Sequence, residues 1–282
     1  MSVKIIADTS CDLEQGSSML ANVSLTPFVI TIGKETFRDT EKTREELLAL
    51  MEACAEPARS ACPSPHDFMT LFAGEEEAVF VITISSALSG TFSSAVTAKE
   101  QYQKEHPDKE IYVIDSLSAS AGESAVTHFV VHLTQASAGV SYAVMARMAQ
   151  DYANALTTVF VLEDLSNLMK NGRLSKAKGL VASLLNIKPI LGTDGQGEIV
   201  LVKNARGSKK AMKELFTTIQ EKSHDLNVEE IDIYISHCNA LERAEALRDM
   251  IEGTIPFRSI HILETNGLST VYTANQGVVV AF

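Results

Sequence analysis

The feature that most constrains the fold of this chain is an alternation between short runs of β-branched, apolar residues and longer segments with helical spacing. Such alternation is typical of α/β proteins with a largely parallel sheet, because each crossover between parallel strands needs a connection as long as a helix. The clearest strand candidates are five runs, at residues 3–7, 78–84, 111–114, 157–162 and 231–236.

Two helix starts are marked by capping chemistry. Thr43 followed by Glu46 forms a capping box before an apolar face. Ser64 precedes a proline at the first helical position and Asp67 in the first turn. A further helix is predicted from near Glu163 to residue 171, where Gly172 is suited to end it.

The second half of the chain changes character. Residues 187–191 and 198–203 flank a glycine-rich turn, which predicts an antiparallel hairpin. An earlier hairpin at residues 25–38 turns around Gly33 and Lys34 and departs from the parallel pattern, so we expect it to pack with the second domain and to join its sheet. With 282 residues, the chain is expected to form two domains.

We predict an α/β fold with an N-terminal parallel-sheet α/β domain at residues 1–157 and a C-terminal α+β domain with a mixed sheet at residues 158–282. The 24 basic and 36 acidic residues give a net charge of −12, which opposes a nucleic-acid partner or an anionic membrane surface. The charge-free stretch at residues 124–146 is too polar to span a membrane. The start of the chain lacks the apolar segment of a signal peptide, so we expect a cytoplasmic protein.

The four cysteines indicate neither a disulfide framework nor a zinc site, because they form no CxxC pair and no clustered spacing with histidine. We expect reduced thiols, no metal and no cofactor. The residues are Cys11, Cys54, Cys62 and Cys238.

Small hydroxyl residues follow three of the predicted strands, in the segments DTSCD at 8–12, SSALSGT at 85–91 and DS at 115–116. Hydroxyls and free amides at a helix N-terminus can hold an oxyanion. For a single serine or threonine, an ordinary helix cap is the commoner role. The middle segment is the best candidate because Gly90 permits a close backbone approach beside Ser89.

Other chemistry has weaker support. The sequence contains no GxxxxGK[ST], GxGxxG, HExxH or GxSxG motif. Asp8, Asp12 and His237 leave open a stand-alone small-molecule phosphotransferase or hydrolase. A basic cluster at Arg173, Lys176 and Lys178, with a second one at residues 203–213, is either a solvated helix face or a docking surface for an acidic partner.

Several segments together resemble the DegV family, in the same order as in that family and over essentially the whole chain. They are DTSCDL at 8–13, ISSALSGTF at 84–92, DS at 115–116, LMKNGRLSKA at 168–177, LNIKPIL at 185–191, Lys203 and Arg206.

The resemblance implies a protein that is not itself an enzyme and that binds a long-chain fatty acid in an apolar tunnel between its two domains. It also implies presentation of the carboxylate to the separate, ATP-dependent catalytic subunit of a fatty acid kinase. By position, Ser60 and Ser89 would bind the carboxylate. We expect Arg173 and Arg206 to dock the kinase partner or to steady the phosphorylated head group. The supporting head-group region would comprise Thr9, Ser10, Gly90, Thr91, Ser116 and Tyr272.

The chain departs from the family pattern at two places. Residues 60–63 read SACP where TSQP is usual, so Cys62 replaces a glutamine. Residues 272–276 read YTANQ where HTGPG is usual, so Tyr272 stands in place of a histidine. Tyrosine can donate a hydrogen bond but carries no positive charge near neutral pH. A lipid carrier or sensor without a kinase partner therefore stands beside the kinase-subunit hypothesis.

Overall fold

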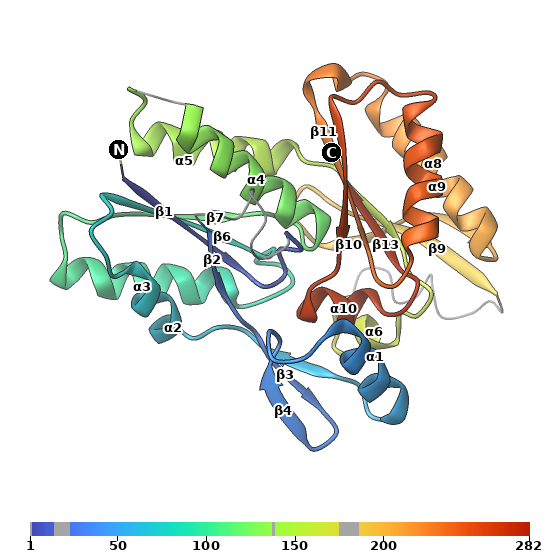
Figure 1. Cartoon of the computed structure of the whole chain (residues 1–282), viewed down its shortest axis with the longest axis horizontal. Helices are drawn as coiled ribbons and strands as arrows, with labels where there is room; N and C mark the ends of the chain where they lie inside the picture. Colours follow the sequence, from blue (N-terminus) through green and yellow to red (C-terminus); the bar gives the residue numbers. More distant parts are fainter. Residues whose placement is uncertain (1, 14–22, 137–138, 175–185) are drawn as a thin grey trace.

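The structure is a computed structural model that describes residues 2–13, 23–136, 139–174 and 186–282. The strands of these residues form a four-stranded, a six-stranded and a three-stranded sheet. Figure 1 shows the four-stranded sheet on the left, the six-stranded sheet on the right, and the small sheet below the junction between them.

The first sheet is parallel throughout, with strand order β2-β1-β6-β7. Its strands alternate in sequence with helices, as the pattern predicts. Ile6, Val79 and Val81 face one side, and Ile5, Phe80 and Ile82 face the other. The strands are β1 (Val3–Asp8), β2 (Val23–Thr26), β6 (Ala78–Thr83) and β7 (Glu110–Asp115).

Two pairs of helices bury the two faces of this sheet. The pair α2 (Pro65–Phe72) and α3 (Thr91–Glu105) covers one face, and the pair α4 (Ala121–Ala136) and α5 (Tyr142–Ala155) covers the other (Figure 1). The helix start predicted at Ser64 is confirmed, since its hydroxyl caps α2 by accepting from the amide of Asp67.

The second sheet is mixed, with order β10-β9-β8-β13-β11-β12, and only its β11–β12 pair is parallel. The hairpin predicted around residues 192–197 is confirmed as β9 and β10. The strands are β8 (Thr158–Val161), β9 (Ile187–Thr193), β10 (Ile199–Arg206), β11 (Asp232–His237), β12 (Ser259–Glu264) and β13 (Val278–Ala281).

Helices α8 (Ser208–Ser223) and α9 (Leu241–Glu252) cover one face of the second sheet, and a 3₁₀ turn, Val228–Glu230, precedes β11. The opposite face meets α4. Helix α4 therefore lies between the two large sheets, with Val126 and Val130 packed toward the first and Ala125 toward the second. This explains why α4 has so few exposed, charged positions.

The small sheet has order β4-β3-β5 and consists of β3 (Val29–Ile32), β4 (Glu35–Arg38) and β5 (Arg59–Ala61). Its hairpin turns at Gly33, which adopts a φ of 58°. The sheet packs with α1 (Arg44–Ala53) against α10 (Gly267–Thr273), an element from the other end of the chain.

Three predictions from the sequence differ from the structure. Residues 25–32 are not one strand: Pro27 separates β2 from β3, because proline lacks the N–H of a continuing ladder. The 25–38 hairpin contacts α10 but does not join the six-stranded sheet. The helix expected from Glu163 starts later, as α6 (Ser166–Lys170), because Asp164 accepts the amide of Ser166.

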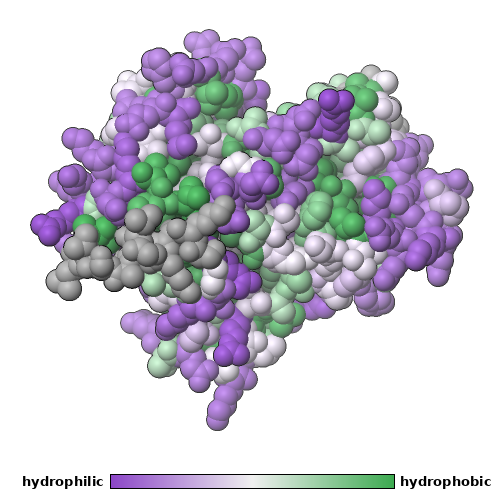
Figure 2. All heavy atoms as spheres, turned by 180° about the vertical axis from the view of Figure 1, so that it is seen from behind, coloured by the Kyte–Doolittle hydropathy of each residue, from purple (hydrophilic) through white to green (hydrophobic). Residues whose placement is uncertain are grey.

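Seen from behind, the two lobes are separated by a notch at the top of the view, and hydrophilic residues cover most of their outer margins (Figure 2). In the described part of the chain, none of the helices combines the length and apolar character needed to cross a bilayer. Buried hydrophobic side chains form clusters inside the lobes and at their junction.

Candidate functional site: an apolar cavity with a polar end

A cavity of about 340 Å³ lies between the first sheet, the second sheet and the small sheet. Its volume falls within the range of small-molecule sites, about 300–1,000 Å³. Apolar side chains from the second sheet, from α6 and α10, and from loops beside the other two sheets line most of it. They are Phe28, Ile84, Leu88, Phe160, Leu162, Leu168, Ile199, Leu268 and Val279.

The period of the strands decides which residues reach the cavity. In β8, Thr158 and Phe160 face it, whereas Val159 and Val161 pack beneath α8 and α9. In β13, Val279 faces the cavity between two residues that point away. Both faces of these central strands are apolar. The sequence of a strand that lines the cavity therefore looks the same as that of a strand buried in the core.

Hydroxyl groups from distant segments line this cavity. Ser60 of β5 and Tyr272 of α10 join their hydroxyls at 2.8 Å, across 212 positions of sequence. Ser89, in the loop before α3, hydrogen-bonds the hydroxyl of Thr91 at 2.8 Å. The structure thus brings Ser60, Ser89 and Tyr272, three of the predicted site residues, to one cavity.

Arg173 is the charged residue among the described residues that line this cavity. Its Nε donates to the carbonyl of Leu88 at 3.1 Å, and another guanidinium nitrogen donates to the carbonyl of Asn171. It forms no ion pair with any residue in the described ranges. A positive charge held by neutral acceptors is available to an anion at this end of the cavity.

The polar end adjoins a second hollow of about 430 Å³ that shares Leu88, Ser89, Gly90 and Arg173 with the cavity. Gly90 is the N-cap residue of α3 and supplies no side chain to cap that helix. The positive end of the dipole of a 15-residue helix therefore faces the same place as Arg173. An anionic head group would find hydroxyls, a helix N-terminus and a guanidinium together there.

The other predicted head-group residues divide into two sets. Ser10 lines the cavity. Thr9, Thr91 and Ser116 are buried beside it, and their hydroxyls bond to Asp39, Ser89 and the carbonyl of Ser118, respectively. These three shape the loops without lining the cavity.

The predicted docking residues are also separated. Arg173 is at the cavity, whereas Arg206 is exposed at the end of β10 and does not line it. Lys203 pairs with Glu221 at 2.7 Å. Lys176 and Lys178 lie outside the described residues.

The loop after β1 holds a group of buried carboxyls. Asp8 accepts the backbone amides of Ser10 and Ile84 at 2.9 and 2.8 Å, yet burial raises its pKa to about 7. Burial raises the pKa of Asp12 and of Asp39 to about 6. Glu123 of α4, buried near Asp8, has a pKa raised well above its ordinary value, mainly by burial.

Asp8 and Asp12 are hydrogen-bonded within the fold, and so is Nδ1 of His237. Asp12 accepts from the Asn266 amide at 2.9 Å and from the Ser120 hydroxyl. His237 accepts the amide of Ala240, and burial lowers its pKa. Asp8, Asp12 and His237 are not among the described residues that line the apolar cavity. The geometry does not favour the hydrolase or phosphotransferase hypothesis.

Comparison with known proteins identifies the family. The family model described as an uncharacterised protein of the DegV family matches residues 2–282. The chain belongs to the DegV family. A DegV domain-containing protein of Streptococcus gordonii is 34% identical over 286 residues, covering 100% of this chain and 99% of the relative.

Two solved structures of DegV proteins are similar along the whole chain. A protein of the DegV family from Ruminococcus gnavus, solved with vaccenic acid, has a TM-score of 0.93 at 32% identity, covering 100% of both chains. The fatty acid kinase (Fak) B3 protein of Streptococcus pneumoniae, loaded with linoleic acid, has a TM-score of 0.89 at 33% identity, covering 100% of this chain and 99% of the other. The predicted family and the two-part fold are thereby confirmed.

The sequence reasoning missed most of the cavity wall. Phe28, Leu168 and Leu268 come from three connecting or short elements without a periodic pattern. Ser118 and Ser269 also line the cavity, although only segments near them, at 115–116 and 272–276, had been singled out from the sequence. The family motifs were the signal that identified Ser60, because a serine in a short edge strand carries no signal of its own.

Proposed function

We propose that this protein binds a long-chain fatty acid in the apolar cavity, with the carboxylate at the end marked by Ser89, Ser60 and Arg173. The observation that carries the proposal is an apolar cavity with hydroxyl groups and the Arg173 guanidinium in its lining. The described helices include none able to span a membrane. Burying about 14 methylenes at about 0.8 kcal/mol each gives about 11 kcal/mol, before the costs of association.

The charge pattern supports a carboxylate at this end. A desolvated carboxylate needs hydrogen bonds or a positive partner. The hydroxyls of Ser60 and Ser89 can each donate one, and the guanidinium of Arg173 supplies the charge. The thiol of Cys62 beside them stays protonated, because burial raises its pKa, and adds no opposing charge.

We further propose that the bound carboxylate is presented to a separate ATP-dependent kinase subunit, which forms an acyl phosphate. Support comes from the similarity to the Fak B3 protein and from the adjoining polar hollow, through which a phosphoryl donor would reach the head group. The protein would act as the lipid-binding subunit in the cytoplasm, without chemistry of its own.

The Tyr272–Ser60 hydrogen bond favours a second candidate, a lipid carrier or sensor without a kinase. The test is phosphoryl transfer from labelled ATP to bound fatty acid, with a DegV-dependent kinase subunit added to wild type and to Tyr272→His. Transfer by wild type supports the kinase role. Transfer by Tyr272→His alone supports the carrier, and lipid binding without transfer by either protein rejects the kinase role.

A further inference from the structure

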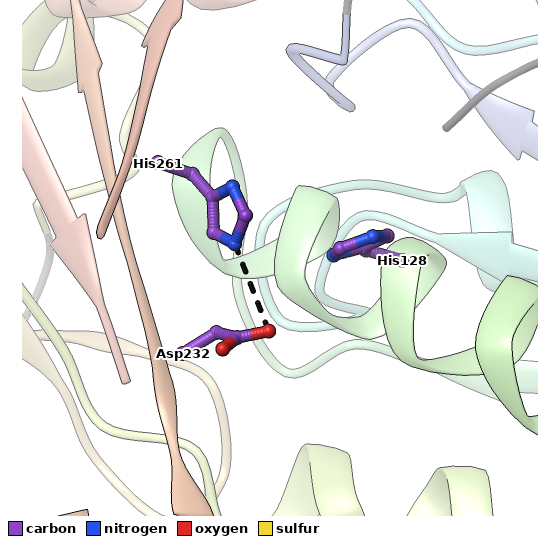
Figure 3. Close-up of side chains that lie close together, drawn as sticks. All are labelled: His128, Asp232 and His261. Atoms are coloured by element: carbon purple, nitrogen blue, oxygen red, sulfur yellow. Dashed lines mark ion pairs between the residues drawn. The ribbon is translucent and has the colours of Figure 1, made fainter. Parts of the chain in front are cut away.

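A group of histidine and aspartate side chains lies away from the lipid cavity, where α4 meets the edge of the second sheet. One ligand atom each of His128, Asp232 and His261 lies within 4.8 Å of the other two. His128 comes from α4, and the other two come from the neighbouring strands β11 and β12 (Figure 3). None of the three is among the described residues that line the cavity.

We propose that His128, Asp232 and His261 form a binding site for a divalent transition-metal ion, with Zn²⁺ as the representative ion. Two imidazoles and a carboxylate are a donor set suited to zinc, which keeps a fourth position for water in such three-ligand sites. The proposal is independent of lipid binding, since it rests on other residues.

The distances fit this donor set. In a tetrahedral zinc site with bonds of about 2.1 Å, ligand atoms lie about 3.4 Å apart. Nε2 of His261 lies 3.6 Å from Oδ2 of Asp232, and the dashed line in Figure 3 marks this pair. The third ligand atom needs to move by only about an ångström to complete the set.

One ligand atom lacks the partner that its burial requires. Nε2 of His261 is buried and has no hydrogen-bond partner among the described residues. An unpartnered buried polar atom costs free energy, which a bound metal would remove. Tyr234 stacks on the His261 ring at 4.7 Å and holds its orientation.

The surrounding contacts supply the outer support that metal sites use. Tyr234 also hydrogen-bonds Nδ1 of His128, which leaves Nε2 as the metal ligand. Nε2 of His128 now contacts Nε2 of His132 at 2.8 Å; His132 is exposed and can turn into solvent.

Among the described residues, Arg258 contacts Asp232 and opposes a cation, and it also orients the carboxylate. It donates to Oδ1 and Oδ2 of Asp232, at 2.8 Å each. A carboxylate offers about four acceptor positions, so each oxygen keeps one after this pairing. The metal would join α4 of the first lobe to the second sheet, across the junction between the lobes.

Titration calorimetry of the metal-stripped full chain with ZnCl₂ tests the site. We expect one Zn²⁺ per chain, a loss of affinity of at least about tenfold in His261→Ala, and none in His224→Ala, whose histidine is exposed at the end of α8. The midpoint of thermal unfolding should rise by about 5 °C at a free zinc concentration of 100 times Kd. No binding, or equal loss in both variants, overturns the proposal.

X-ray absorption of the zinc-loaded wild type decides the matter even where a variant fails to fold. Only nitrogen and oxygen ligands, with the scattering of two imidazoles, support the site. A zinc–sulfur shell would place the metal on a cysteine such as Cys54 or Cys62 and would overturn the proposal.

Discussion

Two loops at the same edge of the first sheet contain similar residues, but one loop bonds to the rest of the fold and the other lines the cavity. Strands β1 and β6 are neighbours, and each ends in a segment of small hydroxyl residues. After β1, the polar groups of Asp8 and Asp12 are turned inward and bonded to amides and hydroxyls of other elements. After β6, Ser89 and Gly90 line both the cavity and the polar hollow.

The difference shows that a polar strand end becomes a binding site only where the fold leaves its donors available. The loop after β1 connects the lobes: Asp12 reaches Asn266, and Asn266 in turn reaches the carbonyl of Cys11. We expect changes in this loop to affect stability, and changes in the loop after β6 to affect lipid affinity.

The largest expected effect comes from Asp12→Ala. The substitution leaves the amide of Asn266 and the hydroxyl of Ser120 without their acceptor in a buried place, and we expect a loss of about 3–5 kcal/mol in the free energy of unfolding. Urea unfolding measures it. Asp151→Ala, which removes an exposed pair with Arg147, should cost less than about 0.5 kcal/mol. Equal costs for the two variants would remove the distinction between the loops.

The second prediction concerns pH. The folded-state pKa of Asp8, about 7, lies above the ordinary 3.8, so the folded protein holds this proton more tightly than the unfolded chain. Its stabilising contribution is full below about pH 4 and is lost as the pH rises through 7. The cost of Asp8→Asn should therefore shrink between about pH 4 and about pH 8, on the order of 4 kcal/mol.

Asp67→Asn provides the control of opposite sign for this pH dependence. The Ser64 hydroxyl and Arg38 lower the pKa of Asp67, so its contribution is present at neutral pH and is lost in acid. Urea unfolding across the pH range measures both variants. A cost of Asp8→Asn that does not change with pH would show that Asp8 ionises normally in the folded protein.

In the loop after β6, Ser89→Ala should weaken fatty-acid binding by about 1–3 kcal/mol, or about 5- to 150-fold, if its hydroxyl pairs with a buried carboxylate. Its effect on the free energy of unfolding should be small. Thr97→Ala is the control, because Thr97 is exposed on α3, the helix that follows this loop, and is not among the residues lining the cavity or the polar hollow. Calorimetry with oleate compares them, and similar affinities would remove Ser89 from the site.

The smallest effect is expected for Tyr272→Phe, which deletes one hydroxyl from the Ser60–Tyr272 pair. We expect a change in lipid affinity of about 0.5–1.5 kcal/mol, the net worth of a single neutral hydrogen bond. The same calorimetry measures it. A loss much larger than that of Ser89→Ala would move the centre of the carboxylate site from the loop after β6 to α10.

Local signals in the sequence predicted much of the fold. Capping residues such as Ser64 and Thr43 act within one turn, and the confirmed strands of the first sheet carry their own β-branched runs. Pro27 separates β2 from β3, but this break is evident only once the two strands are seen to belong to different sheets. The domain boundary near residue 157 stays a prediction.

The site was less accessible to sequence reasoning because its parts meet only in three dimensions. Ser60 and Tyr272 are neighbours through the docking of β5 on α10, which no local pattern reports. The histidines of α4 were a missed signal: His128 and His132 are four residues apart, on one face of the helix. The partners of His128, on β11 and β12, are more than 100 positions away.

The central claim is that the cavity between the lobes holds a long-chain fatty acid by its carboxylate. Denaturing mass spectrometry of an organic extract of the purified protein tests it most directly, followed by titration with oleate after delipidation. We expect about one fatty acid per chain, which is restored on titration of wild type and is bound more weakly by Ser89→Ala. A protein that carries no fatty acid and binds none when it is supplied would contradict the account.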